Sequence, residues 1–375
     1  MSRVAVALSG GVDSSVAAML LADAGAPVVG LAMRLYDRAG DDGAGTRRCC
    51  APRDLRDARH AADRIGIPFY VIDMQSEFRE EVVAPFAAAY RAGRTPVPCI
   101  ACNSGPKFRH LMRRARSLGA DRLATGHYAR IARDPRTGRF ALLRARDPAR
   151  DQSYFLFEMT QEQLSRTEFP VGDLPKPEVR RLAADRGLPN AAKPDSQDIC
   201  FVPDGRYQAI VRRESTAPEP GGEIVTTDGR VVGRHDGLSG FTVGQRRGLG
   251  ALGGRPHYVV ALEAASRRVV VGVEAEQYAG GLVAASVNWV SVAPPDRPIR
   301  ALARIRSAHA GAPATVLACG GDRIEVRFDA PQRAVAPGQA VVLYDDDRVL
   351  GGGFIEASID TPRSAMLQSG AEARA

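Results

Sequence analysis

The sequence predicts an α/β protein: an N-terminal parallel sheet with helices on both faces, a small mostly-β central domain and a C-terminal β-barrel domain. Over residues 1 to about 200, apolar strand-like runs alternate with helix-like segments, the order typical of a parallel sheet. Near residue 203 the pattern changes to short β-like runs separated by turn signals such as Asp228-Gly229. We expect domains at 1–202, 203–284 and 285–359, and a disordered tail at 360–375.

The first domain is expected to start with the strand Val4–Leu8, followed at once by a helix over Val16–Leu21. Further strands and helices are expected, in chain order, at Val28–Leu35, Asp54–Ile65 (helix), Pro68–Asp73, Glu77–Arg91 (helix), Lys107–Leu118 (helix) and Arg122–Thr125. Parallel sheets bind ligands at the carboxyl ends of their strands. Gly10, Met33 and Gly126 should therefore lie near one edge.

The last domain is expected to be a small barrel, because its β-branched runs are short and separated by turn residues. These runs are Val287–Val292, Ile299–Ile305, Ala314–Ala318, Ile324–Phe328 and Ala340–Tyr344.

The 375-residue chain carries a formal net charge of +8, which fits an acidic partner such as RNA. Its richness in Arg and Ala offers a second explanation, genomic base composition. No apolar run approaches the roughly 20 residues that span a bilayer, so we expect no membrane association. The start enters a strand at once without the build of a signal peptide, which predicts a cytoplasmic protein.

Ser9–Ser15 (SGGVDSS) joins the first strand to the first helix. Glycines let an anion approach backbone N–H groups, and the helix start adds unpaired donors and the positive end of the helix dipole. Asp13, Ser14 and Ser15 are expected either to cap the helix or to bind the ligand. The loop lacks the lysine of GxxxxGK[ST], and an ordinary turn with a capped helix is the alternative.

This loop resembles the SGGxDS loop of the PP-loop ATP pyrophosphatases. Those enzymes cleave ATP between its α and β phosphates and pass AMP to a substrate oxygen. The resemblance implies ATP binding, adenylation and a Rossmann-like sheet of the PP-loop type. The substrate must be inferred from other parts of the chain.

Three of the six cysteines fall in distinctive segments: Cys99 and Cys102 form a C-x-x-C, and Cys200 lies in DSQDICF. Half of a zinc site and an iron–sulfur cluster are two interpretations. The pair Cys49-Cys50 is expected to pack against apolar residues. Cys319, isolated in the β region, is expected to be a small buried side chain.

Cysteines on two loops of an adenylating domain suggest sulfur transfer. Adenylation turns a carbonyl oxygen into a leaving group, and a cysteine persulfide delivers sulfur. A second thiol can attack the persulfide, release sulfide and leave a disulfide. Thiolates need an electropositive site, for which Lys107, Arg109 and the start of the first helix are candidates.

From about residue 1 to 358 the chain resembles the bacterial tRNA-specific 2-thiouridylases. The motifs that carry the resemblance are SGGVDSS, TPxPCxxCNxxxKF, ATGHYAR, DQSYFL, KPDSQDICF, GQRRGLG and PGQAVVLYD. This family thiolates C2 of the wobble uridine of certain tRNAs. It uses ATP, Mg²⁺ and persulfide sulfur from a donor protein, a cysteine desulfurase or a relay. The resemblance implies a tRNA-uridine 2-sulfurtransferase, and we expect a monomer.

The resemblance also implies site residues. Cys102 would be the nucleophile, Cys200 would carry the persulfide, and a Cys102–Cys200 disulfide would form transiently. No side chain is assigned to a resident metal. ATP would be held by Ala7, Leu8, Ser9, Gly10, Gly11, Val12, Asp13, Ser14, Met33 and Gly126. The tRNA would be held by Val97, Pro98, Cys99, His127, Arg150, Asp151, Gln152, Arg306, Ser307 and Gln339.

The chain departs from the family at Val97, where Asn is usual, and at Pro106, where Ile is usual. Val97 removes an amide that could bind the target base. Three other functions stay open: an amidotransferase-type PP-loop synthetase, a cluster-dependent tRNA thiolase, and an RNA-binding protein with a decayed nucleotide site. The intact SGGVDS loop argues against the last.

Overall fold

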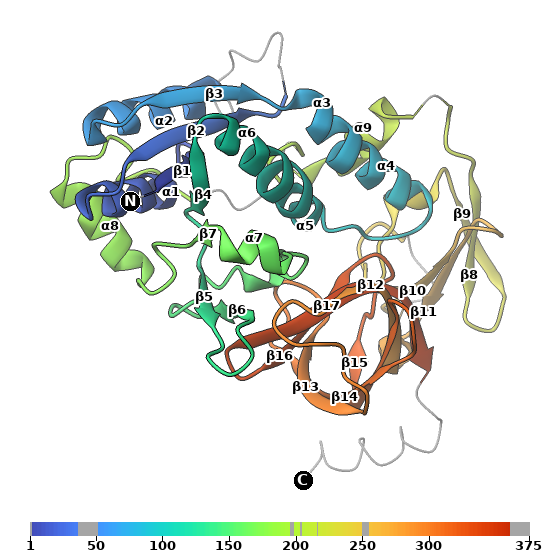
Figure 1. The fold of residues 1–375 in the computed structure, drawn as a ribbon. Helices are drawn as coiled ribbons and strands as arrows, with labels where there is room; N and C mark the ends of the chain where they lie inside the picture. Colours follow the sequence, from blue (N-terminus) through green and yellow to red (C-terminus); the bar gives the residue numbers. More distant parts are fainter. Residues whose placement is uncertain are drawn as a thin grey trace. The chain divides into compact units, whose positions relative to one another are not determined.

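The computed structural model describes residues 2–36, 52–195, 199–202, 205–215, 217–249 and 255–360. Cys49, Cys50 and the tail beyond residue 360 lie outside these ranges. The chain divides into two compact units (Figure 1). Unit 1 comprises Met1–Ala84, Pro98–Tyr207 and Asp347–Val349, and unit 2 comprises Pro85–Val97, Gln208–Asp346 and Leu350–Ala375.

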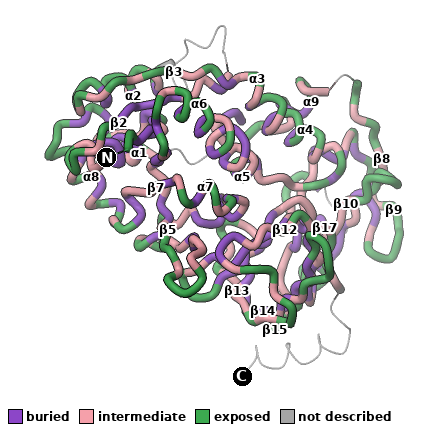
Figure 2. Tube along the Cα trace, in the orientation of Figure 1, coloured by how far each residue is buried: buried purple, intermediate pink, exposed green. Residues whose placement is uncertain are grey.

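Unit 1 is built on a five-stranded parallel sheet of order β3-β2-β1-β4-β7. The central strand has no exposed surface at Val4, Ala5 and Val6, because both of its faces are covered (Figure 2). The four predicted strands are confirmed as β1 Arg3–Ala7, β2 Val28–Arg34, β3 Phe69–Asp73 and β4 Ala120–Thr125. The fifth strand, β7 Thr167–Glu168, is only two residues long and was not predicted.

Small side chains let two helices approach this sheet closely. Ala18 of α1 (Val12–Asp23) and Ala58 and Ala62 of α2 (Pro52–Ile65) share a core with Val4, Val6 and Val28. Val16 of α1 contributes to a second core with Val179 and Ala183 of α8 (Lys176–Asp185). The first helix is therefore buried over most of its length, and its start is held rigidly at the end of β1.

Two helical runs contain π-helical turns. The first comprises α3 Gln75–Phe78, η1 Arg79–Val83 and α4 Ala84–Arg91, which confirms the predicted helix. The second comprises α5 Pro98–Cys102, η2 Asn103–Leu111 and α6 Met112–Ser117. The helix predicted at Lys107–Leu118 thus begins too late. Pro106 has no N–H for the Cys102 carbonyl four residues earlier, and the wider π turn accommodates it.

Unit 1 also contains an antiparallel hairpin, β5 Ala129–Arg133 and β6 Phe140–Arg144. Leu142 and Leu143 of β6 pair with Val349 and Arg348, residues from near the end of the chain. Unit 1 also contains the helices η3 Ser153–Leu156 and α7 Gln161–Ser165, whereas α9 Tyr207–Arg213 belongs to unit 2 from Gln208 onward.

Unit 2 contains a four-stranded sheet of order β10-β11-β8-β9. Its bounds are β8 Gly222–Thr226, β9 Val231–His235, β10 Tyr258–Glu263 and β11 Arg268–Gly272, with short helices η5 Leu238–Gly240 and η6 Glu274–Gln277. Val259, Val269 and Val271 are completely buried in its core. The expected mostly-β central region is this sheet.

Six strands of unit 2 form a closed barrel of order β12-β15-β14-β13-β16-β17, because β17 pairs back onto β12. They are β12 Tyr278–Asn288, β13 Ile299–Arg304, β14 Ala312–Ala318, β15 Ile324–Arg333, β16 Ala340–Asp345 and β17 Arg348–Asp360. The run predicted at Val287–Val292 was displaced: the strand begins at Tyr278 and ends at Asn288. Its Gly- and Ala-rich first half lacks the β-branched signal.

Among the described helices, none has the length and apolar character needed to cross a membrane.

Candidate active site

The loop after β1 is shaped by two features of its backbone. Gly10 has φ +75°, and a Cβ there would overlap the carbonyl oxygen of Asp54. Gly11 is the N-cap of α1, and no side chain caps this described helix end. Asp13, Ser14 and Ser15 therefore do not cap α1, contrary to one expectation. The helix start is left open toward an anionic ligand.

Hydroxyl groups hold the loop instead. The Ser9 N–H donates to Ser14 Oγ at 3.2 Å, and the two hydroxyls lie 3.2 Å apart. The Ser14 and Ser15 hydroxyls each donate to the Gly11 carbonyl at 3.1 Å. Three serines thus fix a glycine turn whose Ser9 is exposed.

Gly126, the residue after β4, lies very close to the backbone at the start of α1. A Cβ on Gly126 would lie 2.5 Å from the backbone nitrogen of Ser14 and 2.6 Å from the carbonyl carbon of Asp13. Ala7 pairs with Thr125, just before Gly126, and Met33 lies in β2 on the other side of β1. The structure therefore brings the predicted ATP residues together at the carboxyl ends of three adjacent strands.

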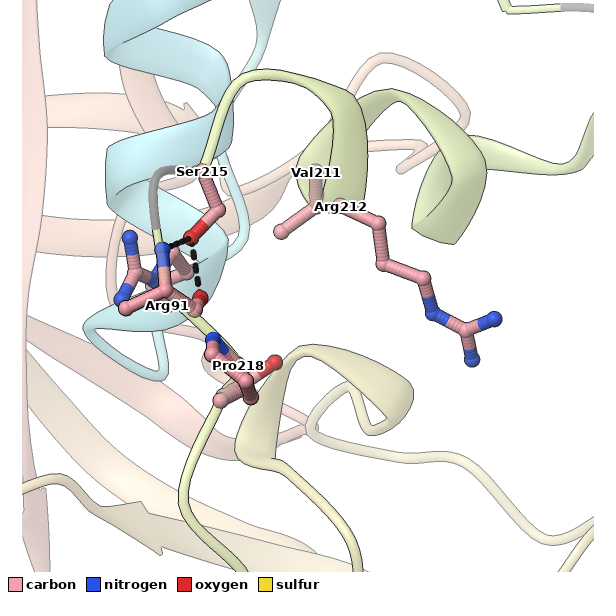
Figure 3. A pocket seen from close by; sticks show the side chains of 7 residues that line it. Arg91, Val211, Arg212, Ser215 and Pro218 are labelled. Atoms are coloured by element: carbon pink, nitrogen blue, oxygen red, sulfur yellow. Dashed lines mark hydrogen bonds between the residues drawn. The ribbon is translucent and has the colours of Figure 1, made fainter.

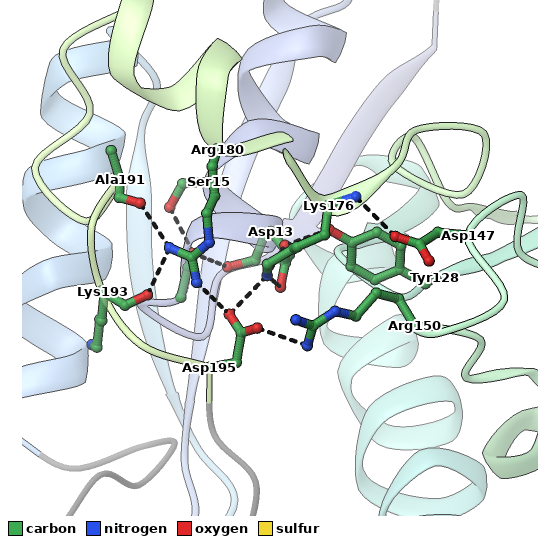
Figure 4. Close-up of polar contacts among 12 residues, drawn as sticks. Asp13, Ser15, Tyr128, Asp147, Arg150, Lys176, Arg180, Ala191, Lys193 and Asp195 are labelled. Atoms are coloured by element: carbon green, nitrogen blue, oxygen red, sulfur yellow. Dashed lines mark hydrogen bonds and ion pairs between the residues drawn. The ribbon is translucent and has the colours of Figure 1, made fainter. Parts of the chain in front are cut away.

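Asp13 points into a partly buried polar cluster rather than into the helix end (Figure 4). Lys176 at the start of α8 donates to both carboxylate oxygens of Asp13, at 2.7 and 2.8 Å. The Tyr128 hydroxyl donates to the same carboxylate at 2.7 Å. Burial, with the charge of Asp13, raises the pKa of Tyr128, so its phenol keeps the proton that it donates.

Asp195 lies on the other side of Lys176 and meets three cations. Its carboxylate contacts Lys176 at 2.8 Å, Arg150 at 2.8 Å and Arg180 at 2.9 Å (Figure 4). Burial alone would raise the pKa of Asp195, but the hydrogen bond from Lys176 and the three positive charges lower it. Asp195 is therefore an anion at neutral pH. Arg150, predicted to bind tRNA, is paired within this cluster.

Two residues that were not assigned a role from the sequence fix the glycine loop by donating to the carbonyl of Gly10. Lys193 donates to the Gly10 carbonyl at 3.1 Å and pairs with Asp54 and Asp57, each at 2.5 Å. Asn190 donates to the same carbonyl at 3.1 Å. Because these partners come from distant parts of the chain, no local pattern predicted them.

Cys102 ends α5, and the π turn that follows it carries a polar relay. The Lys107 ammonium donates to Asn103 Oδ1 at 2.7 Å and lies 3.4 Å from His127 Nε2. On the other side, His127 Nδ1 lies 2.6 Å from Thr125 Oγ1. Burial and the Lys107 charge hold the pKa of His127 well below its usual range. His127 is thus a neutral ring that accepts from Lys107 and donates to Thr125.

The backbone around Cys200 is held by contacts with residues that follow β2 and that lie on α3. The Tyr36 hydroxyl, which follows β2, donates to the Cys200 carbonyl at 3.0 Å. The next residue, Phe201, packs edge-on against Phe78 of α3 with ring centroids 5.6 Å apart. Cys102 and Cys200 are both partly buried, and each carries a thiol rather than a disulfide in the structure. The Cys102–Cys200 disulfide therefore stays a prediction.

Other predicted tRNA residues already serve the fold. Asp151 accepts from Ala145 N and from the Ser153 N–H and hydroxyl, and Gln152 accepts from Tyr128 N. In unit 2, Arg306 donates to the Arg333 carbonyl, and exposed Ser307 accepts from Arg304. The Gln339 amide donates to the Thr95 carbonyl, close to partly exposed Val97. Pro98 is buried and Cys99 is exposed.

Arg109 and Cys319 differ from what the sequence predicts. Arg109 pairs with Glu81 at 2.8 Å, so its charge is largely met by a carboxylate rather than by a thiol. Cys319 is exposed, so its expected burial was wrong. It follows β14 at a turn, where the chain leaves the barrel core.

Unit 2 has a separate hollow of about 270 Å³ (Figure 3). It is lined by Arg91, Val211, Arg212, Ser215, Ala217, Pro218 and Glu219. None of the residues predicted to bind ATP, sulfur or tRNA lines it.

Comparison with known proteins covers the chain in three pieces. Residues 2–204 match the family model described as tRNA methyl transferase HUP domain. Residues 213–273 match the tRNA methyl transferase PRC-barrel domain, and residues 279–355 match the aminomethyltransferase beta-barrel domain.

Full-length relatives agree with one another. The tRNA-specific 2-thiouridylase MnmA of Solibacter usitatus is 51% identical over 366 residues, covering 94% of this chain and 99% of the relative. Proteins of the same name from Rhizorhabdus wittichii and Geobacter metallireducens are 52% and 49% identical, covering 96% and 95% of this chain and 92% and 97% of the relatives. The chain belongs to the tRNA-specific 2-thiouridylase family.

Proposed function

We propose that this protein is an ATP-dependent tRNA-uridine 2-sulfurtransferase that converts the wobble uridine to 2-thiouridine. The observation that carries the proposal is the order of three strands. β1 carries the nucleotide loop; Tyr36 after β2 holds Cys200 on one side, and His127 after β4 contacts the Cys102 helix on the other. This order supports a site in which the segments that carry the two thiols serve a base activated at the loop between them.

The first step is adenylation of the uridine. The O2 oxygen attacks the α phosphorus of ATP, the bond to the β phosphate breaks, and pyrophosphate leaves. The open start of α1 and the glycine turn suit the triphosphate, because the first N–H groups of α1 have no side-chain cap, and a Cβ at Gly10 or Gly126 would clash with the backbone that shapes the loop. Mg²⁺ would accompany the phosphates of ATP and lower their charge; the Asp13 carboxylate of the loop already accepts from Lys176 and Tyr128, so no protein ligand is assigned to the ion.

The second step transfers sulfur from a Cys200 persulfide, and two routes fit. In one, the terminal sulfur bonds to C2, AMP leaves, and the Cys102 thiolate then attacks Cys200 Sγ and frees the thiolated base. In the other, Cys102 attacks Cys200 Sγ first, the released sulfide attacks C2, and the C2–O bond breaks so that AMP leaves. Both end in a Cys102–Cys200 disulfide, which a dithiol must reduce before the next turnover.

Lys107 supports the proposed role of Cys102. It lies five residues along the same helical run, and its ammonium donates to Asn103, the residue after Cys102. A nearby cation favours the thiolate, which is the reactive form. The predicted tRNA contacts of His127, Arg150 and the other residues belong to this proposal, as do a persulfide donor protein and a monomeric state.

The test is mass spectrometry of nucleosides from tRNA incubated with the protein, ATP, Mg²⁺ and a persulfide-generating desulfurase. We expect ATP-dependent 2-thiouridine with the natural chain and none with Cys102→Ser or Cys200→Ser. Cys319→Ser is the matched control, because Cys319 is exposed on the barrel and should leave the yield unchanged.

The alternatives give different results. An amidotransferase-type synthetase would keep its activity with alanine at both Cys102 and Cys200. A cluster-dependent thiolase would contain iron and labile sulfide. An RNA-binding protein with a decayed site would bind tRNA without consuming ATP. Absence of 2-thiouridine with every sulfur donor would refute the proposal.

A further inference from the structure

Lys176 is a buried cation that the mechanism above does not use. Only 6% of its side chain is exposed, yet it carries its charge between two carboxylates, Asp13 and Asp195 (Figure 4). Burying an ammonium is unfavourable unless opposite charges surround it. The burial of the Lys176 ammonium therefore depends on both carboxylates. In turn, Lys176 Nζ holds Asp13 and Asp195 together.

The two acids belong to different parts of the proposed chemistry. Asp13 lies in the first turn of α1, within the nucleotide loop. Asp195 precedes Cys200 by five residues and belongs to the same KPDSQDICF segment. The bridge Asp13–Lys176–Asp195 thus runs from the loop that would bind ATP to the residue five positions before Cys200; residues 196–198 lie outside the described ranges.

Arg150 and Arg180 strengthen the second half of the bridge. Arg180 also donates to the carbonyls of Ala191 and Lys193, at 3.0 and 3.1 Å, so it fixes the backbone leading into Asp195. The cluster contains three cations and two carboxylates, and each carboxylate contacts at least one of the cations. A single neutral replacement of Asp195 leaves the Lys176–Asp13 contact in place, which separates the two halves.

Building on the proposed function, we infer that Lys176 and Asp195 are positioning residues that hold the Cys200 segment in register with the nucleotide loop. They act through Asp13 and Cys200 rather than on the reacting atoms. The bridge makes sulfur delivery depend on the same rigid frame that activates the uridine. Loss of Asp195 should therefore uncouple the two steps, because a reacting group displaced by about 1 Å can lose about 100-fold in rate.

The experiment compares pyrophosphate released with 2-thiouridine formed, for the full chain and for Asp195→Asn. We expect pyrophosphate release to stay within about threefold, while 2-thiouridine per pyrophosphate falls at least about tenfold. Asp185→Asn is the matched control: it removes the same charge from α8, but its partner is Arg181 on the exposed side. That control should keep the ratio of the natural chain.

Two outcomes would overturn the inference. An unchanged ratio would mean that Asp195 does not position Cys200. An equal loss of both products would mean that Asp195 serves folding or nucleotide binding. If Asp195→Asn does not fold, Arg180→Gln removes one cation from the same carboxylate at a partly exposed site, and a smaller drop in the same ratio is expected.

A second readout needs no thiolation activity. Alkylation of Cys200 by iodoacetamide, relative to Cys319 in the same sample, should be at least about threefold faster in Asp195→Asn. If the natural chain makes no 2-thiouridine, the proposed function fails while this rate still tests the positioning. An unchanged rate, with an unchanged product ratio, would refute the bridge itself.

Discussion

Gly126→Ala should damage the nucleotide loop without touching the sulfur chemistry. A Cβ at Gly126 would lie 2.5 Å from Ser14 N, whereas ordinary contact begins at 3.4 Å, so the two backbones must separate by about 3.4 − 2.5 = 0.9 Å. Neither side yields easily, because Gly126 directly follows β4, which pairs with the central strand, and Ser14 is a buried residue of α1. Overpacking of this kind costs about 1–3 kcal/mol.

That range sets the expected effect on ATP. If the strain falls on the loop geometry that binds the nucleotide, ATP affinity weakens by about 5- to 150-fold. Isothermal titration calorimetry with ATP and Mg²⁺ measures the affinity, and thermal unfolding measures any share of the strain that destabilises the fold. Gly240→Ala is the control, since a Cβ there would meet nothing within 4 Å.

The result that would refute this reasoning is specific. If Gly126→Ala binds ATP as tightly as Gly240→Ala and unfolds at the same temperature, then the close approach of β4 to α1 does not shape the nucleotide site. A loss of folding stability with unchanged affinity would place ATP elsewhere on the chain.

Three further predictions follow from burial and charge. Burial and the charge of Lys107 lower the pKa of His127, so the unfolded chain binds more protons than the folded chain below about pH 6.5, and the free energy of unfolding falls as the pH drops below that value. Urea unfolding at pH 5.5 and 7.5 measures this difference in free energy, which Lys107→Met should make smaller. An equal difference in the variant would contradict the prediction. Burial raises the pKa of Glu158, so its ionisation opposes folding as the pH rises above its unfolded value; Glu158→Gln should raise the unfolding temperature at pH 7 and lose that advantage near pH 4. Gly10→Ala should destabilise more than Gly25→Ala, since both have positive φ but only Gly10 would also overlap a neighbour, so equal unfolding temperatures would be evidence against the overlap.

Local patterns were enough to predict much of the fold. The β-branched runs of β2 and β3 and the glycine turn after β1 each contain their own signal within a few residues. The helix around Cys102 was predicted less well. Pro96, Pro98 and the C-x-x-C suggested a loop around Cys102, whereas Pro98 starts a helix that contains Cys102. Pro106 lies inside the π turn that follows.

The candidate site was predictable only in part. The glycines and serines of the nucleotide loop form one continuous motif, and the structure brings them together with Gly126. The Lys176–Asp13 contact joins residues 163 positions apart, and Lys193 meets Gly10 across 183. Charged residues at such separations have no period or spacing that links them, so only the folded chain shows which pairs form.

The three-part make-up of unit 1 bears on how the protein is synthesised. Its hairpin strand β6 has one edge paired with β5, and the other edge waits for Arg348 and Val349, near the end of the chain. N-terminal parts of a chain usually fold first as they leave the ribosome. This unit cannot finish in that order, so the nascent protein carries an open strand edge through most of translation, and such edges invite pairing with other chains. A ribosome stalled before Asp347 would hold a nearly complete polypeptide that still needs protection by chaperones.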